Sequence, residues 1–324
     1  MRALVTGATG FIGRRLVDRL LAQGDEVVAL VRDGRHGLPS TVRIQAGDLT
    51  RRDTLGDAGV GCRRLYHLAG LITFDPRERE RLRQVNAQGT ADLLRAAARW
   101  DVERSVVVSS ACTVGLSATP DRLLDEEAGP SPATVSANPY LASKLEAERF
   151  AAEAAKTRHV VVVNPSTVYG PGDHSLNSGT LIRQVARAPA LPLPPGGSNV
   201  VDVDDVVTGI LLAGERGRPG QRYLLGGYNL RFTEIIETMA RVVGRRPLLL
   251  PVPRFTRGLF AAAAWGLGRL AGSRLLTPQV VEDLFAFKFY SSRRAHDELG
   301  WAPRTSFEQS VRGAWAYYRE RGLV

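Results

Sequence analysis

The chain of 324 residues is 44% hydrophobic and 23% charged, which is the composition of an ordinary globular protein. This length fits one large α/β domain with a smaller part attached to it. The net charge of +10 comes from arginines spread along the whole chain among acidic residues, so without a basic block it does not predict a nucleic-acid-binding surface.

Short apolar runs alternate with helical patterns through the first half of the chain. Several runs are continuous stretches of valine, which is typical of parallel strands buried on both faces. The predicted strands are 3–5, 26–31, 42–45, 64–68, 104–108 and 160–163, and the predicted helices are 12–22, 54–58, 78–100 and 139–155. This order predicts an α/β fold with a Rossmann-type, doubly wound parallel sheet.

The glycine-rich sequence TGATGFIG, residues 6–13, joins the first strand to the first helix. Its first glycine allows a tight turn, its second lets the backbone approach a pyrophosphate, and its third permits close packing of helix on strand. Free amides at the start of the helix then face the phosphates. The predicted phosphate-binding residues are Gly7, Thr9, Gly10, Phe11, Ile12 and Gly13.

The end of the second strand bears on the choice of cofactor. A carboxylate there would bind the ribose 2′-hydroxyl of NAD, whereas an arginine accommodates the 2′-phosphate of NADP. Arg32 stands at this position, and Arg35 can help from the loop. Asp33 could instead reach the ribose or neutralise Arg32. The sequence favours NADPH, with NAD as the alternative.

Small, acidic and hydroxyl residues follow the next strands. A carboxylate after the third strand can accept a hydrogen bond from the adenine amino group, although it is also a common helix cap. Small residues after the fourth strand leave space for the cofactor, and the backbone after the sixth can reach the nicotinamide carboxamide. The further cofactor-binding residues predicted are Asp48, Leu49, Leu68, Ala69, Gly70, Ser109, Tyr140, Lys144, Pro165, Ser166 and Val168.

Ser110, Tyr140 and Lys144 are the predicted catalytic residues. Tyr140 and Lys144 lie one helical turn apart, so both side chains point to one face, and Lys144 is one of only three lysines among the 43 basic residues. A free tyrosine titrates near about pH 10. The lysine ammonium, together with the charge of oxidised nicotinamide, would favour the phenolate.

These residues predict the reduction of a carbonyl group. Hydride leaves the dihydronicotinamide for the carbonyl carbon, and Tyr140 donates a proton to the oxygen. Ser110 holds that oxygen by a hydrogen bond, with Thr113 as a reserve hydroxyl. Asn86 is predicted to steady the nearby edge of the sheet in a structural role.

Strands and helices continue in the second half of the chain, interrupted by a proline-rich loop predicted at 189–197. The predicted strands are 200–205 and 223–227, and the predicted helices centre on Ile235, Val281 and Trp315. We expect a dinucleotide-binding domain, and a smaller interwoven substrate-binding part with a closing helix. The first comprises 1–168 with parts of 198–228, and the second comprises 169–197 and 229–324.

The most apolar stretch, Leu259–Leu267, is about half as long as the roughly 20 residues of a membrane-spanning helix. It is predicted to be a buried or dimer-facing helix, although its flanking arginines could let it rest on a membrane surface. Met1 leads directly into a strand, without a signal peptide, so the expected location is the cytoplasm. Two cysteines and five unpaired histidines predict neither a disulfide framework nor a metal site.

Together these motifs resemble the extended short-chain dehydrogenase/reductase family over the whole chain. The matching segments are TGATGFIG, Arg32, GDL at 47–49, VNAQGT at 85–90, SS at 109–110, NPYLASK at 138–144, NPSTVYGPGD at 164–173, VDVDDV at 201–206 and LGWAPRTSFEQSVRGAWAYY at 299–318. The residues after the second strand are most similar to the dihydroflavonol-reductase-like branch. The resemblance implies that Lys144 also binds the nicotinamide ribose.

A homodimer is expected through the helices 78–100 and 139–155, because they carry more apolar surface than one sheet face needs, and the family resemblance implies the same assembly. The apolar residues concerned are Leu82, Val85, Leu93, Leu94, Leu141, Leu145 and Phe150.

Two departures from that family narrow the function. Its dehydratases carry Thr-Asp-Glu where this chain has Ser110, Ala111 and Cys112, so the acid and base of the elimination step are missing. Its sugar-nucleotide epimerases usually carry an arginine where Asn199 and Val200 stand. The predicted function is reduction of a ketone or aldehyde on a small, partly apolar molecule. The alternatives are a sugar epimerase with tightly bound NAD, and a non-catalytic nucleotide sensor.

Overall fold

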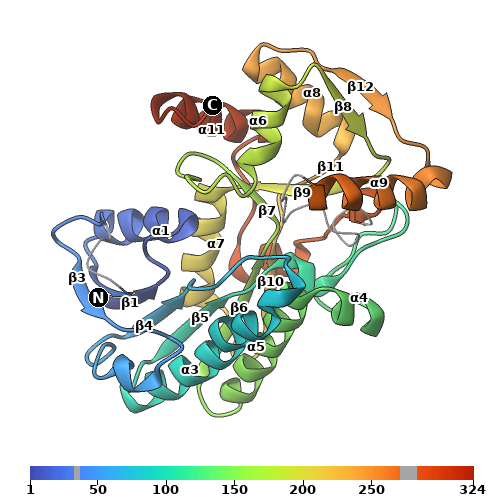
Figure 1. Cartoon of the computed structure of the whole chain (residues 1–324). Coiled ribbons are helices and arrows are strands. Elements are labelled where there is room, and N and C mark those ends of the chain that lie inside the picture. Colours follow the sequence, from blue (N-terminus) through green and yellow to red (C-terminus); the bar gives the residue numbers. More distant parts are fainter. Residues whose placement is uncertain (33–36, 271–282) are drawn as a thin grey trace.

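The computed structural model describes residues 1–32, 37–270 and 283–324. A seven-stranded parallel sheet with helices on both faces forms the larger part of the molecule. A smaller region with two short sheets lies above it in the view of Figure 1. The Rossmann-type architecture predicted from the sequence is confirmed.

The strands of the large sheet follow the order β10-β6-β5-β4-β1-β2-β3, and every neighbouring pair is parallel. The strands are β1 (Arg2–Thr6), β2 (Glu26–Val31), β3 (Arg43–Ala46), β4 (Arg64–His67), β5 (Arg104–Val108), β6 (His159–Pro165) and β10 (Arg222–Leu225). The order reverses between β1 and β4. Open parallel sheets bind their ligands at such a reversal, outside the carboxyl ends of the strands.

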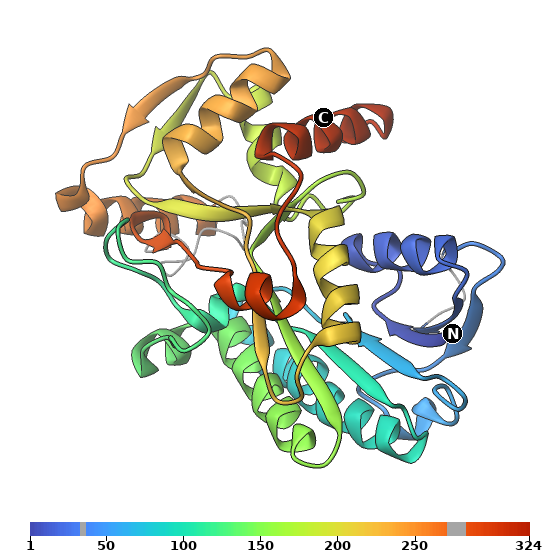
Figure 2. The same cartoon turned by 180° about the vertical axis from the view of Figure 1, so that it is seen from behind.

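Helices cover both faces of the large sheet. Helices α1 and α7 lie side by side over one face, and α3 and α5 lie over the other (Figure 2). Their bounds are α1 (Phe11–Ala22), α3 (Gly89–Arg99), α5 (Pro139–Ala155) and α7 (Val203–Arg216).

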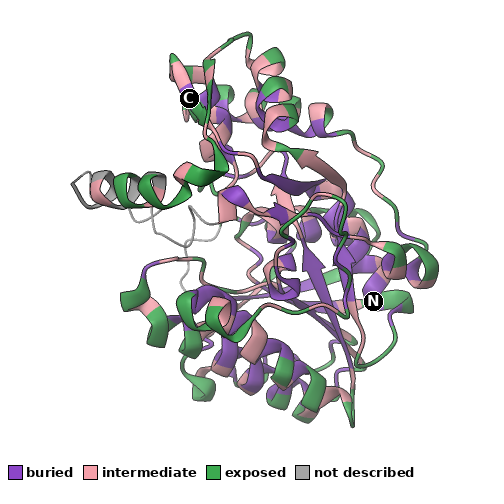
Figure 3. Cartoon of the chain, turned by 90° about the vertical axis from the view of Figure 1, so that its right-hand side faces the viewer, coloured by how far each residue is buried: buried purple, intermediate pink, exposed green. Residues whose placement is uncertain are grey.

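Alternate side chains of the central strands face opposite layers of helices. In β1, Ala3 and Val5 pack in the core beneath α1 and α7, and Leu4 packs in the core beneath α3 and α5. Figure 3 shows these buried strands between helices whose outer faces are exposed. Because both faces are buried, the strands need apolar residues at every position, and this explains the unbroken valine runs in the sequence.

The long helix predicted before β5 is built from successive pieces. A 3₁₀ turn (Pro76–Glu78) leads into α2 (Arg79–Leu82), and a π-helical stretch (Arg83–Gln88) joins α2 to α3. In the π-helical stretch, the Asn86 amide group donates to the Leu71 carbonyl (3.0 Å) and its oxygen accepts from the Leu71 amide (2.7 Å). Asn86 therefore ties the loop after β4 to this helix, and its predicted structural role is confirmed.

Three elements differ from their predictions. The short helix predicted after β3 is a 3₁₀ turn, Arg52–Leu55. The strand predicted at 200–205 ends at Asp202, because the Asp202 side chain accepts a hydrogen bond from the Asp204 amide (2.8 Å) and so starts α7. The proline-rich segment predicted to be a loop contains a strand, β8 (Ala190–Leu193).

The smaller region is organised around β9 (Gly197–Asp202), which pairs antiparallel with one strand and parallel with two others. These are β11 (Tyr228–Arg231), and β7 (Thr167–Tyr169) with β13 (Phe287–Lys288). Strand β8 pairs with β12 (Leu248–Pro251) in a second sheet. The helices here are α6 (Gly179–Arg187), α8 (Phe232–Val243), α9 (Arg257–Leu270) and α11 (Phe307–Glu320), whereas α4 (Pro132–Ala137) contacts α5.

The apolar stretch Leu259–Leu267 lies within α9, as predicted, but Leu259 is 76% exposed. The prediction of a buried helix is therefore wrong at this residue, and a dimer-facing helix stays a prediction. The helix predicted around Val281 lies outside the described residues. Among the helices that the structure describes, none has both the length and the apolar character needed to cross a membrane.

Candidate active site

The turn between β1 and α1 forms a cradle of bare backbone. Gly7 has a φ of +70°, and a Cβ atom there would lie 2.6 Å from the Ala69 amide nitrogen. A Cβ atom on Gly13 would lie 2.0 Å from the Gly7 carbonyl oxygen. Gly10 precedes the first turn of α1, which has no side-chain cap. The cradle therefore requires glycine and leaves the positive end of the helix dipole open to a phosphate, so its donor set fits a dinucleotide.

Arg32 and Asp48 lie close together at the ends of β2 and β3. The Asp48 carboxylate accepts from the Thr50 amide (2.9 Å) and the Thr50 hydroxyl (2.8 Å). The amide hydrogen bond is the main reason that the pKa of Asp48 is lowered, and the charge of Arg32 lowers it further. Arg32 is exposed, and Arg35 lies outside the described residues.

A buried chain of hydrogen bonds runs beneath the cradle. The Thr6 hydroxyl accepts from the Ala69 amide (3.2 Å) and contacts His67 Nδ1 (2.7 Å), and His67 Nε2 contacts the Thr90 hydroxyl (2.8 Å). Thr90 in turn donates to the Asn86 carbonyl (2.5 Å). Because Thr90 uses its proton there, it must accept from Nε2–H, and Nδ1 must accept from Thr6. These hydrogen bonds were not predicted from the sequence, because a histidine inside a strand belongs to no recognisable motif.

Burial lowers the pKa of His67 to about 3, so His67 is neutral in the folded protein. Unfolding restores a pKa of about 6.5, so the unfolded chain binds the extra proton below that pH. We expect His67 to remove about 2 kcal/mol of stability between about pH 7 and pH 5. Urea unfolding of wild type and His67→Gln at both pH values measures it. An equal loss of stability in the two proteins would contradict the conclusion that His67 is neutral in the folded protein. The control is His174→Gln, which replaces an exposed histidine.

Ser110, Tyr140 and Lys144 come together at the carboxyl end of β5. Tyr140 and Lys144 are each 8% exposed, and the Lys144 ammonium donates to the Val108 carbonyl (3.1 Å). Burial raises the pKa of Tyr140 above its ordinary value, the Cys112 thiol raises it further, and the hydrogen bond with Ser110 opposes both. Burial also lowers the pKa of Lys144.

The protein surroundings therefore raise the pKa of Tyr140, whereas the sequence predicted that Lys144 and the oxidised nicotinamide would lower it. Desolvation of the phenolate outweighs any stabilisation by the ammonium of Lys144, which is directed at a backbone carbonyl. Tyr140 is accordingly held in its protonated form. A protonated phenol suits a residue that donates a proton.

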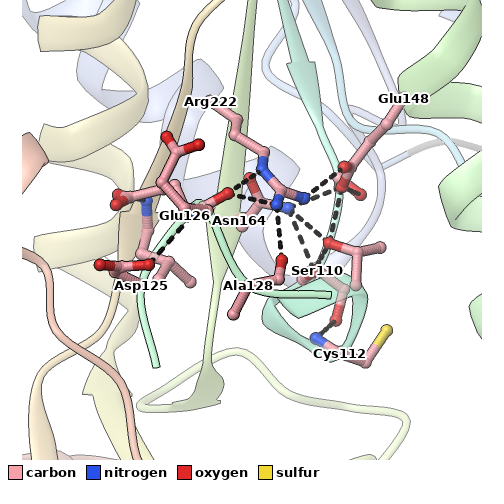
Figure 4. A network of polar contacts seen from close by, with 12 residues as sticks. Ser110, Cys112, Asp125, Glu126, Ala128, Glu148, Asn164 and Arg222 are labelled. Atoms are coloured by element: carbon pink, nitrogen blue, oxygen red, sulfur yellow. Dashed lines mark hydrogen bonds and ion pairs between the residues drawn. The ribbon is translucent and has the colours of Figure 1, made fainter. Parts of the chain in front are cut away.

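A buried network fixes the segment that carries Ser110 (Figure 4). Glu148 Oε1 accepts from the Ser109 hydroxyl (2.5 Å), the Thr113 hydroxyl (2.8 Å) and the Asn164 amide group (2.7 Å). Arg222 lies 3.2 Å from Glu148 Oε2 and neutralises the carboxylate. Thr113 is fully buried, so its predicted role as a reserve hydroxyl is wrong. Sequence reasoning also missed Glu148, Asn164 and Arg222, which no local motif joins.

Arg222 extends the network to the segment that follows Gly115. Its guanidinium donates to the carbonyls of Glu126 (2.8 Å from Nε) and Ala128 (2.8 Å). The Glu126 carboxylate accepts from the Leu224 amide (2.8 Å). One arginine on β10 thus anchors both the segment that carries Ser110 and the loop beside it.

Tyr140 and Ser110 face a cavity of about 170 Å³. Its wall is mostly apolar, and Phe74 contacts Tyr140 edge-on at 5.9 Å between ring centres. The main apolar residues of the wall are Phe74, Leu116, Leu141, Pro165 and Tyr290. An ion pair between Lys288 and Asp283 (3.0 Å), which sequence reasoning missed, lies at the same cavity.

The remaining predicted residues lie around the cradle and the cavity. The backbones of Leu68 and Ala69 touch Gly7, and a Cβ atom on Gly70 would lie 3.4 Å from the Lys144 ammonium. Ser166 lines the cavity, and its buried hydroxyl has no partner among the described residues. Two predicted residues do not face the cavity. Leu49 is buried under α3, and Val168 on β7 pairs with Val201 on β9.

Residues 3–226 match the model of the NAD-dependent epimerase/dehydratase family. The chain is 33% identical to the putative dihydroflavonol 4-reductase of Synechocystis sp., over 99% of this chain and 95% of that one. It is also 33% identical to sterol demethylase protein B of Methylococcus capsulatus, over the whole length of both. Among solved structures it is similar to gox2253, with a TM-score of 0.84 and 32% identity over 99% of this chain and 98% of that one.

Proposed function

This chain belongs to the NAD-dependent epimerase/dehydratase family, of the extended short-chain dehydrogenase/reductase type, and from that premise we propose that it reduces a ketone or aldehyde with NADPH. That it is an NAD(P)-dependent oxidoreductase follows from the family. The proposed substrate is a small, partly apolar molecule. The observation that carries the proposal is the position of Tyr140 beside Ser110, at the wall of a mostly apolar cavity.

The proposed cofactor site runs from Arg32 past the glycine cradle to Lys144. Gly7, Gly10 and Gly13 would admit the pyrophosphate to the first turn of α1, and Arg32 would meet the 2′-phosphate. The buried hydroxyl of Ser166, which has no partner among the described residues, would offer a hydrogen bond to the nicotinamide. When bound, the reduced nicotinamide supplies hydride.

The residues of the chain supply the proton and the orientation. Tyr140 donates its phenolic proton to the substrate oxygen as negative charge develops there, and Ser110 donates a second hydrogen bond. Lys144 is held by the Val108 carbonyl and would bind the ribose hydroxyls of the cofactor. Glu148 and Arg222 keep the Ser110 segment from moving, so the donors are already in place before the reaction.

The decisive experiment is to identify the dinucleotide that binds, and to measure whether it exchanges. NADPH oxidation with a panel of ketones and aldehydes tests the reductase directly. Tightly bound NAD that co-purifies, with turnover of a nucleotide sugar and no added cofactor, would instead favour an epimerase. Binding of a dinucleotide without turnover of either substrate class would favour the nucleotide sensor.

Replacing Arg32 with Ala should weaken NADPH binding by about 1.5–3 kcal/mol, the scale of a hydrogen bond to a charged group, and should leave NADH binding nearly unchanged. Titration of both dinucleotides by fluorescence measures the difference. Arg19→Ala, which removes an exposed arginine from the outer side of α1, is the matched control. Equal losses for both dinucleotides would show that Arg32 does not select NADPH.

We also propose a homodimer through α3 and α5, although less apolar surface is available than the sequence predicts. Leu82, Leu93, Leu94 and Leu141 are buried within the chain itself, so their predicted role at the interface is wrong. Phe150 remains partly exposed beside a groove of about 390 Å³ between the two helices. Light scattering at micromolar concentration should give twice the 35.2 kDa chain mass, and Phe150→Glu should lower it.

A further inference from the structure

One segment of the smaller region carries arginines without acidic residues and exposes large apolar side chains. Residues 238–270 hold six arginines and no acidic residue, although the chain has 33 acidic residues in all. The described and exposed part of this segment is named here the basic apolar surface. It consists of Arg245, Arg246, Leu248, Leu250, Arg254, Phe255, Arg257 and Leu259.

The apolar side chains of the basic apolar surface are at least half exposed to solvent. Phe255 is 89% exposed, Leu259 76%, Leu248 63% and Leu250 50%. They make up half of the large apolar side chains exposed among the described residues, and they fall close together in the chain. Four exposed apolar side chains within residues 248–259 are more than the ordinary scatter of single residues and are typical of an interaction surface.

The basic members give this surface its charge. Arg245 and Arg246 are exposed, and no carboxylate among the described residues pairs with their guanidinium groups. Arg254 lies 5.7 Å from the centre of the Phe287 ring and has its Nη2 atom 3.5 Å from the Ala118 carbonyl. Uncompensated positive charge beside exposed apolar groups matches a partner that is anionic at its surface and apolar beneath it.

The position of the segment suits such a partner. Helix α9 lies at the outer side of the smaller region (Figure 1), and most of its residues with a described burial are exposed (Figure 3). A second copy of the chain fits this surface poorly, because two copies of the same basic surface repel one another.

We propose that the basic apolar surface docks on a membrane that contains anionic lipids. Phe255 and Leu259 enter the interface between headgroups and acyl chains, and Arg245 and Arg246 contact lipid phosphates. The protein binds there peripherally and reversibly.

The surface borders a second cavity, which shares one lining residue with the cavity at Tyr140. This second cavity, of about 360 Å³, is lined by Arg254 and Arg257 and by Leu116, and Leu116 also lines the cavity at Tyr140. Docking therefore places the approach to Tyr140 at the lipid surface, where a partly apolar substrate is concentrated. This last step rests on the proposed function, whereas the docking itself does not.

Co-sedimentation with lipid vesicles tests the docking without any measurement of turnover. The full chain should sediment with vesicles of phosphatidylcholine and phosphatidylglycerol in equal parts, much less with phosphatidylcholine alone, and less as salt is raised. Two double variants, Phe255→Ser with Leu259→Ser and Arg245→Glu with Arg246→Glu, should each lower partitioning by about tenfold or more. Thermal unfolding and NADPH titration of each variant check that the fold is unchanged.

Matched controls lie elsewhere on the molecule. Val60→Ser removes another exposed apolar side chain, and Arg319→Glu reverses another exposed arginine, so neither should change partitioning. The proposal is overturned if wild type stays in the supernatant with the mixed vesicles, or if the double variants bind as wild type does. A change of oligomeric state in Phe255→Ser with Leu259→Ser would also overturn it, because that result assigns the surface to a second copy.

Discussion

Replacing Tyr140 with Phe should lower reductase turnover by about 10²–10⁴-fold while the chain folds normally and still binds NADPH. The change removes one hydroxyl group, so the edge-on contact with Phe74 and the apolar packing are kept. What is lost is the proton that the phenol donates to the substrate oxygen. Steady-state kinetics on an accepted carbonyl substrate, together with NADPH titration, separates this loss from a loss of binding.

Variants of the neighbouring residues sharpen this test. Lys144→Met should lose activity and also weaken NADPH binding, whereas Ser110→Ala should be milder because water can replace one hydrogen bond. Tyr317→Phe, on α11 in the smaller region, is the matched control. If Tyr140→Phe keeps more than about a tenth of the wild-type turnover, the proton comes from another group.

Replacing Glu148 with Ala should destabilise the fold by about 3 kcal/mol, the scale of breaking a buried ion pair from one side. Three donors lose their shared acceptor, and Arg222, with a side chain only 24% exposed, loses its counter-ion. Denaturant unfolding followed by circular dichroism measures the change. Activity should fall as well, because the segment that carries Ser110 is no longer held.

Variants at Glu153, on the same helix α5, and at Arg222, the ion-pair partner, complete the test of Glu148. Glu153→Ala removes an exposed glutamate further along α5 and should cost less than about 1 kcal/mol. Glu148→Gln keeps an oxygen for the three donors, so its free energy of unfolding should lie between those of wild type and Glu148→Ala. In a double-mutant cycle, Arg222→Met should recover part of the loss, because it removes the unpaired charge. Additive losses would mean that the pair does not couple.

The sequence predicts the parts of this molecule that depend on local chemistry. The cradle at Gly7 and Gly13 follows from backbone geometry that only glycine adopts, and the valine runs follow from burial on both faces of the sheet. Tyr140 and Lys144 could be paired because one helical turn separates them. The upward shift in the pKa of Tyr140 could not be foreseen, because it depends on how completely the folded chain removes water from the phenol.

The supporting residues could not be predicted because they meet only in the folded chain. Glu148, Asn164 and Arg222 come from α5, β6 and β10, and each has an ordinary structural explanation when it is read alone. Thr113 looked available for catalysis in the sequence, but Glu148 engages its hydroxyl. The strand β8 was hidden by its proline, Pro192, and by the prolines on either side of it, and its short pairing with β12 tolerates Pro192 at the edge of a sheet.

The ion pair between Glu148 and Arg222 also sets an order for the biosynthesis of the protein. The two residues are 74 positions apart in the chain, so the ribosome releases α5 well before β10. A nascent chain that ends before β10 already holds the glycine cradle, Ser110, Tyr140 and Lys144, yet it must bury a carboxylate without its guanidinium partner. We therefore expect a chain truncated before β10 to be less stable than the full chain and to be cleaved more readily by a protease.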